Sequence, residues 1–144
     1  MVKWIKKVID KLGCLDTWVW LLIRISIGVL FARTGWGKLH NLDRVIGFFT
    51  NLGIPFPRIQ APFVATVEFV GGLCILFGIG IRFASIPLMV TMLVAIGTAK
   101  MGDVENPFDF VTLTEWIYFV LLAAFVVRGA GKASLDAWLG KKIK

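Results

Sequence analysis

The chain of 144 residues allows one domain, residues 1–144, since domains typically run to about 100–200 residues. Hydrophobic residues make up 58% of the chain and charged residues 17%, against about 45–50% and about 25% in soluble proteins, which excludes a small soluble fold and a disordered chain. The formal charge of +7 lies mostly at the ends of apolar runs and forms no basic stripe, so nucleic acid is not expected as a partner. The composition therefore predicts a small integral membrane protein that contacts the lipid bilayer.

Four apolar runs approach the length of about 20 residues that a helix needs to cross about 30 Å of hydrocarbon. They cover about Leu15–Trp36, Ile59–Ile81, Phe83–Met101 and Leu113–Arg128. The fourth run is short, and we expect it to borrow apolar residues from segment 108–111. The predicted fold class is all-α, an integral membrane four-helix transmembrane bundle.

Three segments outside these runs carry apolar residues at helical spacing, with polar residues on the opposite face. The middle segment has Asn41 as a candidate N-cap and ends at Gly53, and in the C-terminal segment Ser134 can cap a short helix. We expect interfacial amphipathic helices at the N-terminus, between the first two spans and at the C-terminus. Membrane anchoring and docking of a partner protein both remain open as roles of the two ends. The apolar positions are Ile5, Val8, Ile9 and Leu12, then Leu42, Val45, Ile46, Phe49 and Leu52, then Leu135, Trp138 and Leu139.

The basic residues are divided unequally between the two sides of the predicted membrane domain. An even number of spans puts both termini on one side, which carries ten Lys and Arg residues against five on the other. Because cytoplasmic segments are enriched in Lys and Arg, both termini are predicted to be cytoplasmic. The ten are Lys3, Lys6, Lys7, Lys11, Arg82, Arg128, Lys132, Lys141, Lys142 and Lys144, and the five are Arg33, Lys38, Arg44, Arg58 and Lys100.

Two ionisable residues, Arg24 and Glu68, lie deep within the predicted spans, far from the span ends. Each is costly in hydrocarbon, by about 2.5–3.5 kcal/mol, so both are expected to face the protein interior. Measured from the inner end of each span they lie about 13 Å and about 19 Å deep, which permits an Arg24–Glu68 pair. An ion pair that fixes helix register, a polar pocket for a ligand with carbonyl or hydroxyl groups, and a proton or ion path all remain open. Small residues on the same faces favour close helix packing, namely Gly28, Ala32 and Gly35 on the first helix and Ala61, Ala65 and Gly72 on the second.

A second polar cluster is expected where the first span ends and the fourth begins. Interfacial anchoring explains the aromatic residues there, including Tyr118, but not an arginine and a glutamate just inside the apolar limits. The candidate ligand-binding residues from both clusters are Arg24, Arg33, Lys38, Glu68, Glu115 and Tyr118.

No complete catalytic constellation is visible in the sequence. His40, the only histidine, is expected in a loop, far from Cys14 and Cys74, so a nucleophile beside a base is not formed. The two cysteines provide neither a disulfide framework nor a zinc site, and no nucleotide-binding pattern occurs. We therefore expect no metal and no covalent cofactor, and enzymatic activity stays open. Redox chemistry would require a diffusible carrier or a partner protein.

The order of several short motifs resembles the DoxX family. The first span reads Arg24-x-x-x-Gly28-x-x-Phe31-x-x-x-Gly35-x-x-Lys38. The segment Leu52-Gly53-Ile54-Pro55 precedes the second span, which contains Glu68-x-x-Gly71-Gly72. Glu115 opens the fourth span, and the tail reads Gly129-x-Gly131-Lys132-x-Ser134-Leu135-Asp136. The similarity extends from about Leu22 to Leu139, nearly the whole chain.

The resemblance implies a four-helix inner-membrane protein of a bacterium or archaeon. Family members are named for a small quinol oxidase subunit, and relatives are linked to thiosulfate:quinone oxidoreduction, membrane oxidoreductase complexes and resistance to thiol or oxidative stress. By this analogy the chain is expected to be an accessory or quinone-associated subunit of a membrane oxidoreductase system. Its implied partners are a quinone, a soluble or membrane oxidoreductase, and a second copy of the chain in a homo-oligomer. A scaffold or stress-response protein without a ligand, and a small metabolite or proton transporter, are the alternatives.

Overall fold

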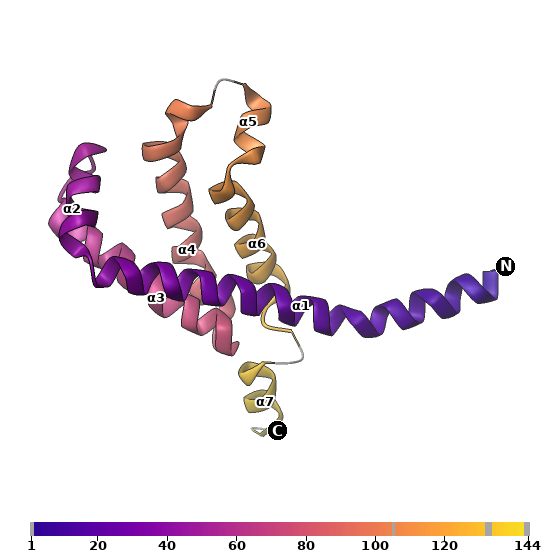
Figure 1. Ribbon diagram of the computed structural model, residues 1–144. Helices are drawn as coiled ribbons and strands as arrows, with labels where there is room; N and C mark the ends of the chain where they lie inside the picture. The colour runs from indigo at the N-terminus through magenta and orange to yellow at the C-terminus, as the bar shows by residue number, and fades with distance from the viewer. Residues whose placement is uncertain (1, 105, 132–133, 143–144) are drawn as a thin grey trace.

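The computed structural model describes residues 2–104, 106–131 and 134–142, and all side chains in these ranges except those of residues 2–14, 103, 107 and 139–142. Throughout the described part, the regular elements are helices and no strand occurs, as predicted (Figure 1). The elements are α1 (Val2–Leu39), α2 (Leu42–Asn51), α3 (Pro57–Phe77), α4 (Ile81–Ala95), the π-helical turn η1 (Ile96–Lys100), the 3-10 turn η2 (Met101–Asp103), α5 (Pro107–Thr112), α6 (Thr114–Arg128) and α7 (Leu135–Lys142).

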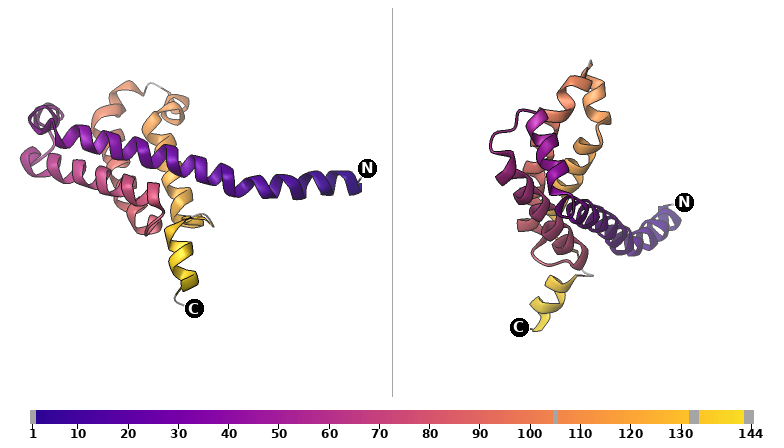
Figure 2. Two further views of the ribbon diagram at one scale, coloured as in Figure 1. Left: turned by 60° about the horizontal axis from the view of Figure 1, so that its bottom comes forward. Right: turned by 60° about the vertical axis from the view of Figure 1, so that its left-hand side comes forward.

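The long helices pack as two antiparallel pairs, α1 with α3 and α4 with α6. Contacts between α3 and α4 join the pairs, and α2 packs mainly on α3. Figures 1 and 2 show the α4–α6 pair crossing the α1–α3 pair, while the N-terminal part of α1 extends beyond the other helices. The four long helices therefore form two crossed pairs, and their axes are not all parallel.

Small residues on α1 and α3 bring the two backbones into direct contact. A Cβ atom on Gly28 would lie 2.6 Å from Leu76 N, and a Cβ atom on Gly72 would collide with the backbone of Ala32. Gly35 is equally close to α3. The predicted small-residue faces are therefore confirmed, and these contacts fix the antiparallel register of α1 against α3.

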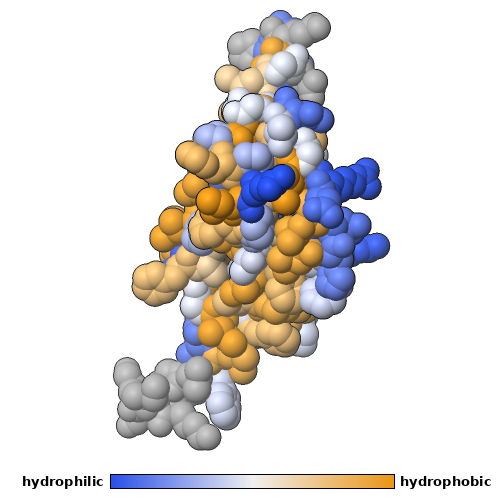
Figure 3. All heavy atoms as spheres, turned by 90° about the vertical axis from the view of Figure 1, so that its left-hand side faces the viewer, coloured by the Kyte–Doolittle hydropathy of each residue, from blue (hydrophilic) through white to orange (hydrophobic). Residues whose placement is uncertain are grey.

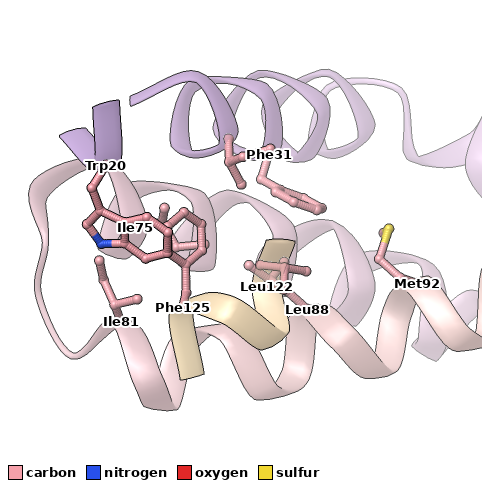
Figure 4. Close-up of a cluster of buried hydrophobic side chains, with 9 residues drawn as sticks. Trp20, Phe31, Ile75, Ile81, Leu88, Met92, Leu122 and Phe125 are labelled. Carbon is pink, nitrogen blue, oxygen red and sulfur yellow. The ribbon is translucent and has the colours of Figure 1, made fainter. Parts of the chain in front are cut away.

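A core of apolar side chains joins α1, α3, α4 and α6 (Figure 4). Trp20 and Phe125 meet edge to face with ring centroids 5.1 Å apart, a favourable geometry for aromatic rings. This contact holds the first helix against the last long helix of the chain. The buried members of the core are Trp20, Ile27, Phe31, Ile75, Ile81, Leu88, Met92, Leu122 and Phe125.

Within the described residues, three helices are long and apolar enough to cross a membrane. They are Leu15–Leu39, Pro57–Phe77 and Ile81–Lys100, each with a mean hydropathy of 1.7. Large apolar side chains stay exposed on their outer faces, as expected where the neighbouring medium is lipid. The first three predicted spans are therefore confirmed as helices of suitable length and composition.

The fourth predicted span is shorter than the hydrocarbon requires. α6 has 15 residues, which corresponds to about 22 Å. The preceding residues do not continue it, because Leu113 is extended (φ −61°, ψ 131°) and α5 is a separate short helix. The N–H of Asn106 donates to Asp109 Oδ2 at 2.9 Å and closes a capping box at the start of α5. Segment 108–111 thus belongs to α5, and a fourth membrane crossing stays a prediction.

The helix predicted between the first two spans is present as α2. Its apolar residues Val45, Ile46 and Phe49 are half-buried, whereas Arg44 and Thr50 are exposed. The helix is followed, as predicted, by a glycine at positive φ in the loop toward α3. Figure 3 shows the face that carries α2, where a broad hydrophobic surface is interrupted by a cluster of hydrophilic residues. The position of α2 in a membrane interface stays a prediction.

The two ends of the chain are arranged differently from each other. The N-terminal segment is not a separate helix, because α1 is continuous from Val2 to Leu39. The side chains of its predicted apolar face, and that of Cys14, lie outside the described residues. At the other end Ser134 Oγ accepts the N–H of Ala137 at 3.1 Å, so the predicted cap of α7 is confirmed. Trp138 on α7 is exposed, and the side chain of Leu139 lies outside the described part.

Candidate functional site

A partly buried ion pair joins α1 to α3. Lys38 lies in the last turn of α1 and Glu68 in the middle of α3, and the antiparallel register brings them together. Lys38 Nζ is 2.6 Å from Glu68 Oε1, and the Glu68 side chain is only 4% exposed. A carboxylate in such surroundings needs a partner of opposite charge, because burial removes its hydration. Lys38 supplies that charge, which places it in one site with Glu68.

The second carboxylate oxygen of Glu68 has no such partner. Oε2 is buried and receives no hydrogen bond from any described residue. Buried polar atoms are hydrogen-bonded in the great majority of cases, to protein groups or to ordered water. An oxygen of this kind therefore marks a place where a water molecule or a ligand atom can bind.

Glu68 also lines a cavity of about 100 Å³ enclosed by α2, α3 and the α4–η1 helix. Its polar groups besides the ion pair are Thr91 and Thr98, whose hydroxyls donate to backbone carbonyls of the same helix and keep oxygen lone pairs free. The cavity lies where α4 gives way to the π-helical turn η1, and such turns are frequent at functional sites. The remaining lining residues are apolar, namely Phe48, Phe49, Leu52, Ile54, Val64, Val94, Ala95 and Ala99.

The wall that α2 contributes is the least firmly packed part of this cavity. No residue of α2 is buried, and only Ile54, just beyond it, is held in the core. The connection to α3 passes through Gly53 (φ 69°) and Phe56 (φ 51°). A positive φ is strained for a bulky residue such as Phe56, and strain of this kind is common beside binding sites.

Arg24 does not pair with Glu68, so the Arg24–Glu68 ion pair that the sequence permits is not formed. Arg24 Nη1 lies beside Gly78 at the end of α3, whereas Glu68 is ten residues earlier in the same helix, about 15 Å along its axis. The depths estimated from the sequence assumed that the inner ends of the two spans lie at the same height in the membrane. In the structure α1 continues far beyond the end of α3, so Arg24 is opposite the α3–α4 turn.

The charge of Arg24 is instead placed among backbone carbonyls. Its Nη1 donates to Ala130 O at 2.9 Å, while Nε is buried without a described partner. One turn away along α1, Trp20 Nε1 donates to Gly129 O at 3.1 Å. The C-terminal ends of α3 and α6 meet here, and helix C-termini carry partial negative charge that favours a cation. Arg24 therefore acts as a structural link between helices.

The glycine-rich tail after α6 is fastened to the α3–α4 turn. Asp136 Oδ2 accepts the N–H of Gly80 at 2.9 Å, and the N–H of Asp136 donates to Gly78 O at 3.1 Å. Arg128 forms an ion pair with Asp16 and lies over the Trp20 ring, 4.6 Å from its centroid. These contacts give the tail motif a structural role in joining α7 to the helix ends.

The predicted outer cluster is not joined by any described interaction. Arg33 is exposed, and Glu115 is half-buried in the first turn of α6. Tyr118 packs edge to face on Phe31, with centroids 5.8 Å apart. A pocket formed by Arg33, Glu115 and Tyr118 stays a prediction, separate from the Lys38–Glu68 cavity.

The sequence reasoning missed the residues that complete this cavity. Thr91 and Thr98 lie on the third span, for which the sequence analysis considered only the length of the apolar run and not the polar residues within it. The apolar face of α2 was recognised, but Phe48 falls outside the predicted stripe and still lines the cavity. Within the part of the chain that the structure describes, no three His, Cys, Asp or Glu side chains gather where they could hold a metal ion.

Comparison with known proteins gives one family and several relatives. The family model described as DoxX matches residues 19–101, which include every residue lining the cavity. The chain is 30% identical over 129 residues to "Putative oxidoreductase CatD" of Bacillus subtilis, covering 81% of this chain and 93% of that protein. It is 33% identical over 125 residues to "Inner membrane protein YqjF" of Escherichia coli, covering 85% and 92%. It is 28% identical over 134 residues to "Uncharacterized membrane protein Rv3486" of Mycobacterium tuberculosis, covering 85% and 82%. No solved structure matches the chain significantly.

Proposed function

This chain belongs to the DoxX family of membrane proteins, and we propose that it is a quinone-associated accessory subunit of a membrane oxidoreductase system in the inner membrane. The observation that carries the proposal is the buried Glu68 carboxylate, which is paired with Lys38 through one oxygen and has no described partner for the other. The oxidoreductase name of one relative is consistent with such a role.

The ion pair offers groups that the chemistry of a quinone headgroup requires. Reduction of a quinone to a quinol takes up two electrons and two protons. Lys38 can donate a hydrogen bond to a carbonyl oxygen, and Glu68 can hold or release a proton at Oε2. In this proposal the electrons come from the partner oxidoreductase, and the chain holds the headgroup and handles its protons.

The size of the cavity sets a condition on binding. Its volume of about 100 Å³ is smaller than a cavity of about 150 Å³ that is known to hold a benzene ring. The lining is nevertheless of the kind that binds small organic ligands, apolar with a few convergent polar groups. Because α2 has no buried residue, it is the wall that moves outward when a ring binds.

The proposal includes a topology with four crossings and both termini in the cytoplasm. α1, α3 and the α4–η1 helix supply three crossings, and α6 together with α5 supplies the fourth. The excess of Lys and Arg on the side of the termini supports this orientation. The Lys38–Glu68 cavity then lies toward the outer side of the membrane, since it is at the end of α1.

The test begins with the purified parent protein in lipid nanodiscs. Bound quinone is extracted and quantified, and a short-tailed quinone analogue is titrated against tryptophan fluorescence. We expect Glu68→Gln and Lys38→Met each to weaken analogue binding by about tenfold or more, since each loses a charge-assisted hydrogen bond. Melting temperatures, measured alongside, separate lost binding from lost folding.

Two variants of the outer cluster locate the site. Glu115→Gln and Tyr118→Phe should leave the affinity unchanged if the quinone binds beside Glu68. If these two variants bind the quinone analogue more weakly and Glu68→Gln binds it as tightly as the parent, the site is at the outer cluster. A parent protein that neither retains nor binds a quinone would reject the proposed function and favour a scaffold or a transporter.

A further inference from the structure

A second polar cavity lies where the α3–α4 turn meets the end of α6 and the start of α7. Its volume is about 350 Å³, and its charged lining residues are Arg82, Arg128 and Asp136. It shares no residue with the Lys38–Glu68 cavity, so the proposed quinone site does not use it. It lies at one end of the apolar helices α3, α4 and α6.

The charged groups of this cavity are only partly satisfied by one another. Arg82 Nη2 donates to Val127 O at 3.3 Å, and no described carboxylate pairs with its guanidinium. Asp136 uses Oδ2 to accept the N–H of Gly80, which leaves Oδ1 available. Arg128 is already paired with Asp16. Arg82 and Asp136 thus present one unpaired positive and one partly free negative charge to the same cavity.

An apolar groove adjoins the polar cavity. It runs between α3 and α4, has a volume of about 470 Å³, and shares Gly80 and Phe83 with the polar cavity. The Phe83 side chain is 82% exposed at the junction. The volume of the groove is about three times that of a cavity of about 150 Å³ that is known to hold benzene. Most of its other lining residues are apolar, among them Val67, Val70, Cys74 and Ala84.

We infer that the cavity and groove together bind a phospholipid whose headgroup carries a primary amine. The phosphate lies against Arg82, the ammonium group against Asp136, and one acyl chain lies in the groove. An arginine presents several donors to phosphate oxygens, and a carboxylate accepts hydrogen bonds from an ammonium group. The junction at Gly80 and Phe83 connects the two parts as a lipid connects its headgroup to its chains.

The charge balance selects a zwitterionic lipid over an anionic one. With Arg128 neutralised by Asp16, the described residues that line the cavity contribute about equal positive and negative charge, from Arg82 and Asp136. An anionic headgroup would satisfy Arg82 but would face the carboxylate of Asp136, which is unfavourable for like charges. A headgroup with a fully methylated amine would reach Asp136 without any N–H to donate. This inference depends on the membrane location of the chain and not on quinone binding.

Native mass spectrometry of the delipidated protein in detergent tests the inference directly. Phosphatidylethanolamine, phosphatidylcholine and phosphatidylglycerol with identical acyl chains are added in separate titrations. The expected result is binding of phosphatidylethanolamine about tenfold tighter than either of the other two. Phosphatidylglycerol that binds as tightly as phosphatidylethanolamine would overturn the assignment of the amine.

Conservative variants assign each headgroup contact. Asp136→Asn keeps an oxygen that can accept the Gly80 N–H, so it should remove the preference for phosphatidylethanolamine over phosphatidylcholine without unfolding the tail. Arg82→Gln should weaken all three lipids, and Arg82→Lys should restore part of the affinity. Asp43→Asn and Arg58→Gln, at exposed sites elsewhere, are the matched controls. A preference unchanged in Asp136→Asn, or affinities unchanged in Arg82→Gln, would overturn the site.

A groove variant tests the position of the acyl chain. Ala84→Leu adds volume inside the groove without changing any charge. Binding of long-chain phosphatidylethanolamine should weaken severalfold, while a short-chain form of the same headgroup should bind as it does to the parent. Equal weakening of both forms, or of neither, would show that the groove does not hold the chain.

Discussion

Lys38 and Glu68 form an ion pair at 2.6 Å although they are 30 residues apart in the chain, because α1 and α3 run antiparallel in a register fixed by glycine contacts. The pair connects two properties of the protein. It anchors the end of α1 to the middle of α3, and it leaves one oxygen of a carboxylate that lines the cavity without a described hydrogen-bond partner.

Lys38→Met should destabilise the protein by about 3 kcal/mol, the lower end of the usual range for breaking a buried pair, because the Lys38 side chain is 35% exposed. The loss arises because Glu68 stays buried without a partner. The double variant Lys38→Met with Glu68→Leu should recover much of the lost stability, since the unpaired charge is then absent. Thermal unfolding in detergent measures both variants. A double variant as unstable as the sum of the single ones would contradict the pair.

Arg24→Gln and Glu68→Gln should act independently. Arg24 lies opposite the C-terminal end of α3, whereas Glu68 lies in the middle of that helix, and the two side chains share no described partner. Their effects on the free energy of unfolding should therefore add within about 0.5 kcal/mol. A double-mutant cycle on the same unfolding assay gives the coupling energy. Coupling above about 1 kcal/mol would show that the two charges interact after all.

Gly72→Ala should be destabilising although alanine is the better helix former. Its Cβ would collide with the backbone of Ala32, so α1 and α3 must separate, with an expected loss of about 1–3 kcal/mol. Gly47→Ala in α2 is the matched control, because no atom lies within 4 Å of its Cβ position. That substitution should stabilise by about 0.5–1 kcal/mol. Equal effects of the two would mean that the close α1–α3 packing does not form.

Trp20→Phe should loosen the C-terminal tail. The variant keeps an aromatic ring against Phe125 but loses the hydrogen bond to Gly129 O, with an expected loss of about 1–3 kcal/mol. Protease sensitivity of segment 129–136 should rise in parallel. Trp18→Phe, at a side chain that is 65% exposed, should change neither property. Unchanged proteolysis in Trp20→Phe would show that this hydrogen bond does not hold the tail.

The proposed orientation predicts the behaviour of C-terminal fusions. If both termini are cytoplasmic, a C-terminal fluorescent protein should be bright and a C-terminal alkaline phosphatase should be inactive. The reversed pair of results would place the C-terminus outside. Fusion after residue 53, in the loop that follows α2, is the control and should show the opposite pattern.

Local features of the sequence predicted much of this structure. The apolar runs give the long helices, since burial in lipid and backbone hydrogen bonding leave a helix as the natural form of such a run. The spacing of Gly28, Ala32 and Gly35 identifies the face of α1 that packs on α3. Ser134 predicts the cap of α7, because its hydroxyl accepts a hydrogen bond from the backbone N–H three residues later. Each of these depends on interactions within a helix or on one face of it.

The partner of Glu68 was decided only by the tertiary structure. The sequence gives the length of each apolar run but not how far one helix slides along another, and a shift of a few turns exchanges Arg24 for Lys38 as the neighbouring cation. The glycine contacts set that position. The crossing of α4–α6 over α1–α3 then brings Thr91 and Thr98 to the cavity beside the carboxylate, and α2 reaches it by packing on α3. Helix register and crossing arise from packing between segments distant in the chain, so the composition and periodicity of single segments do not contain them.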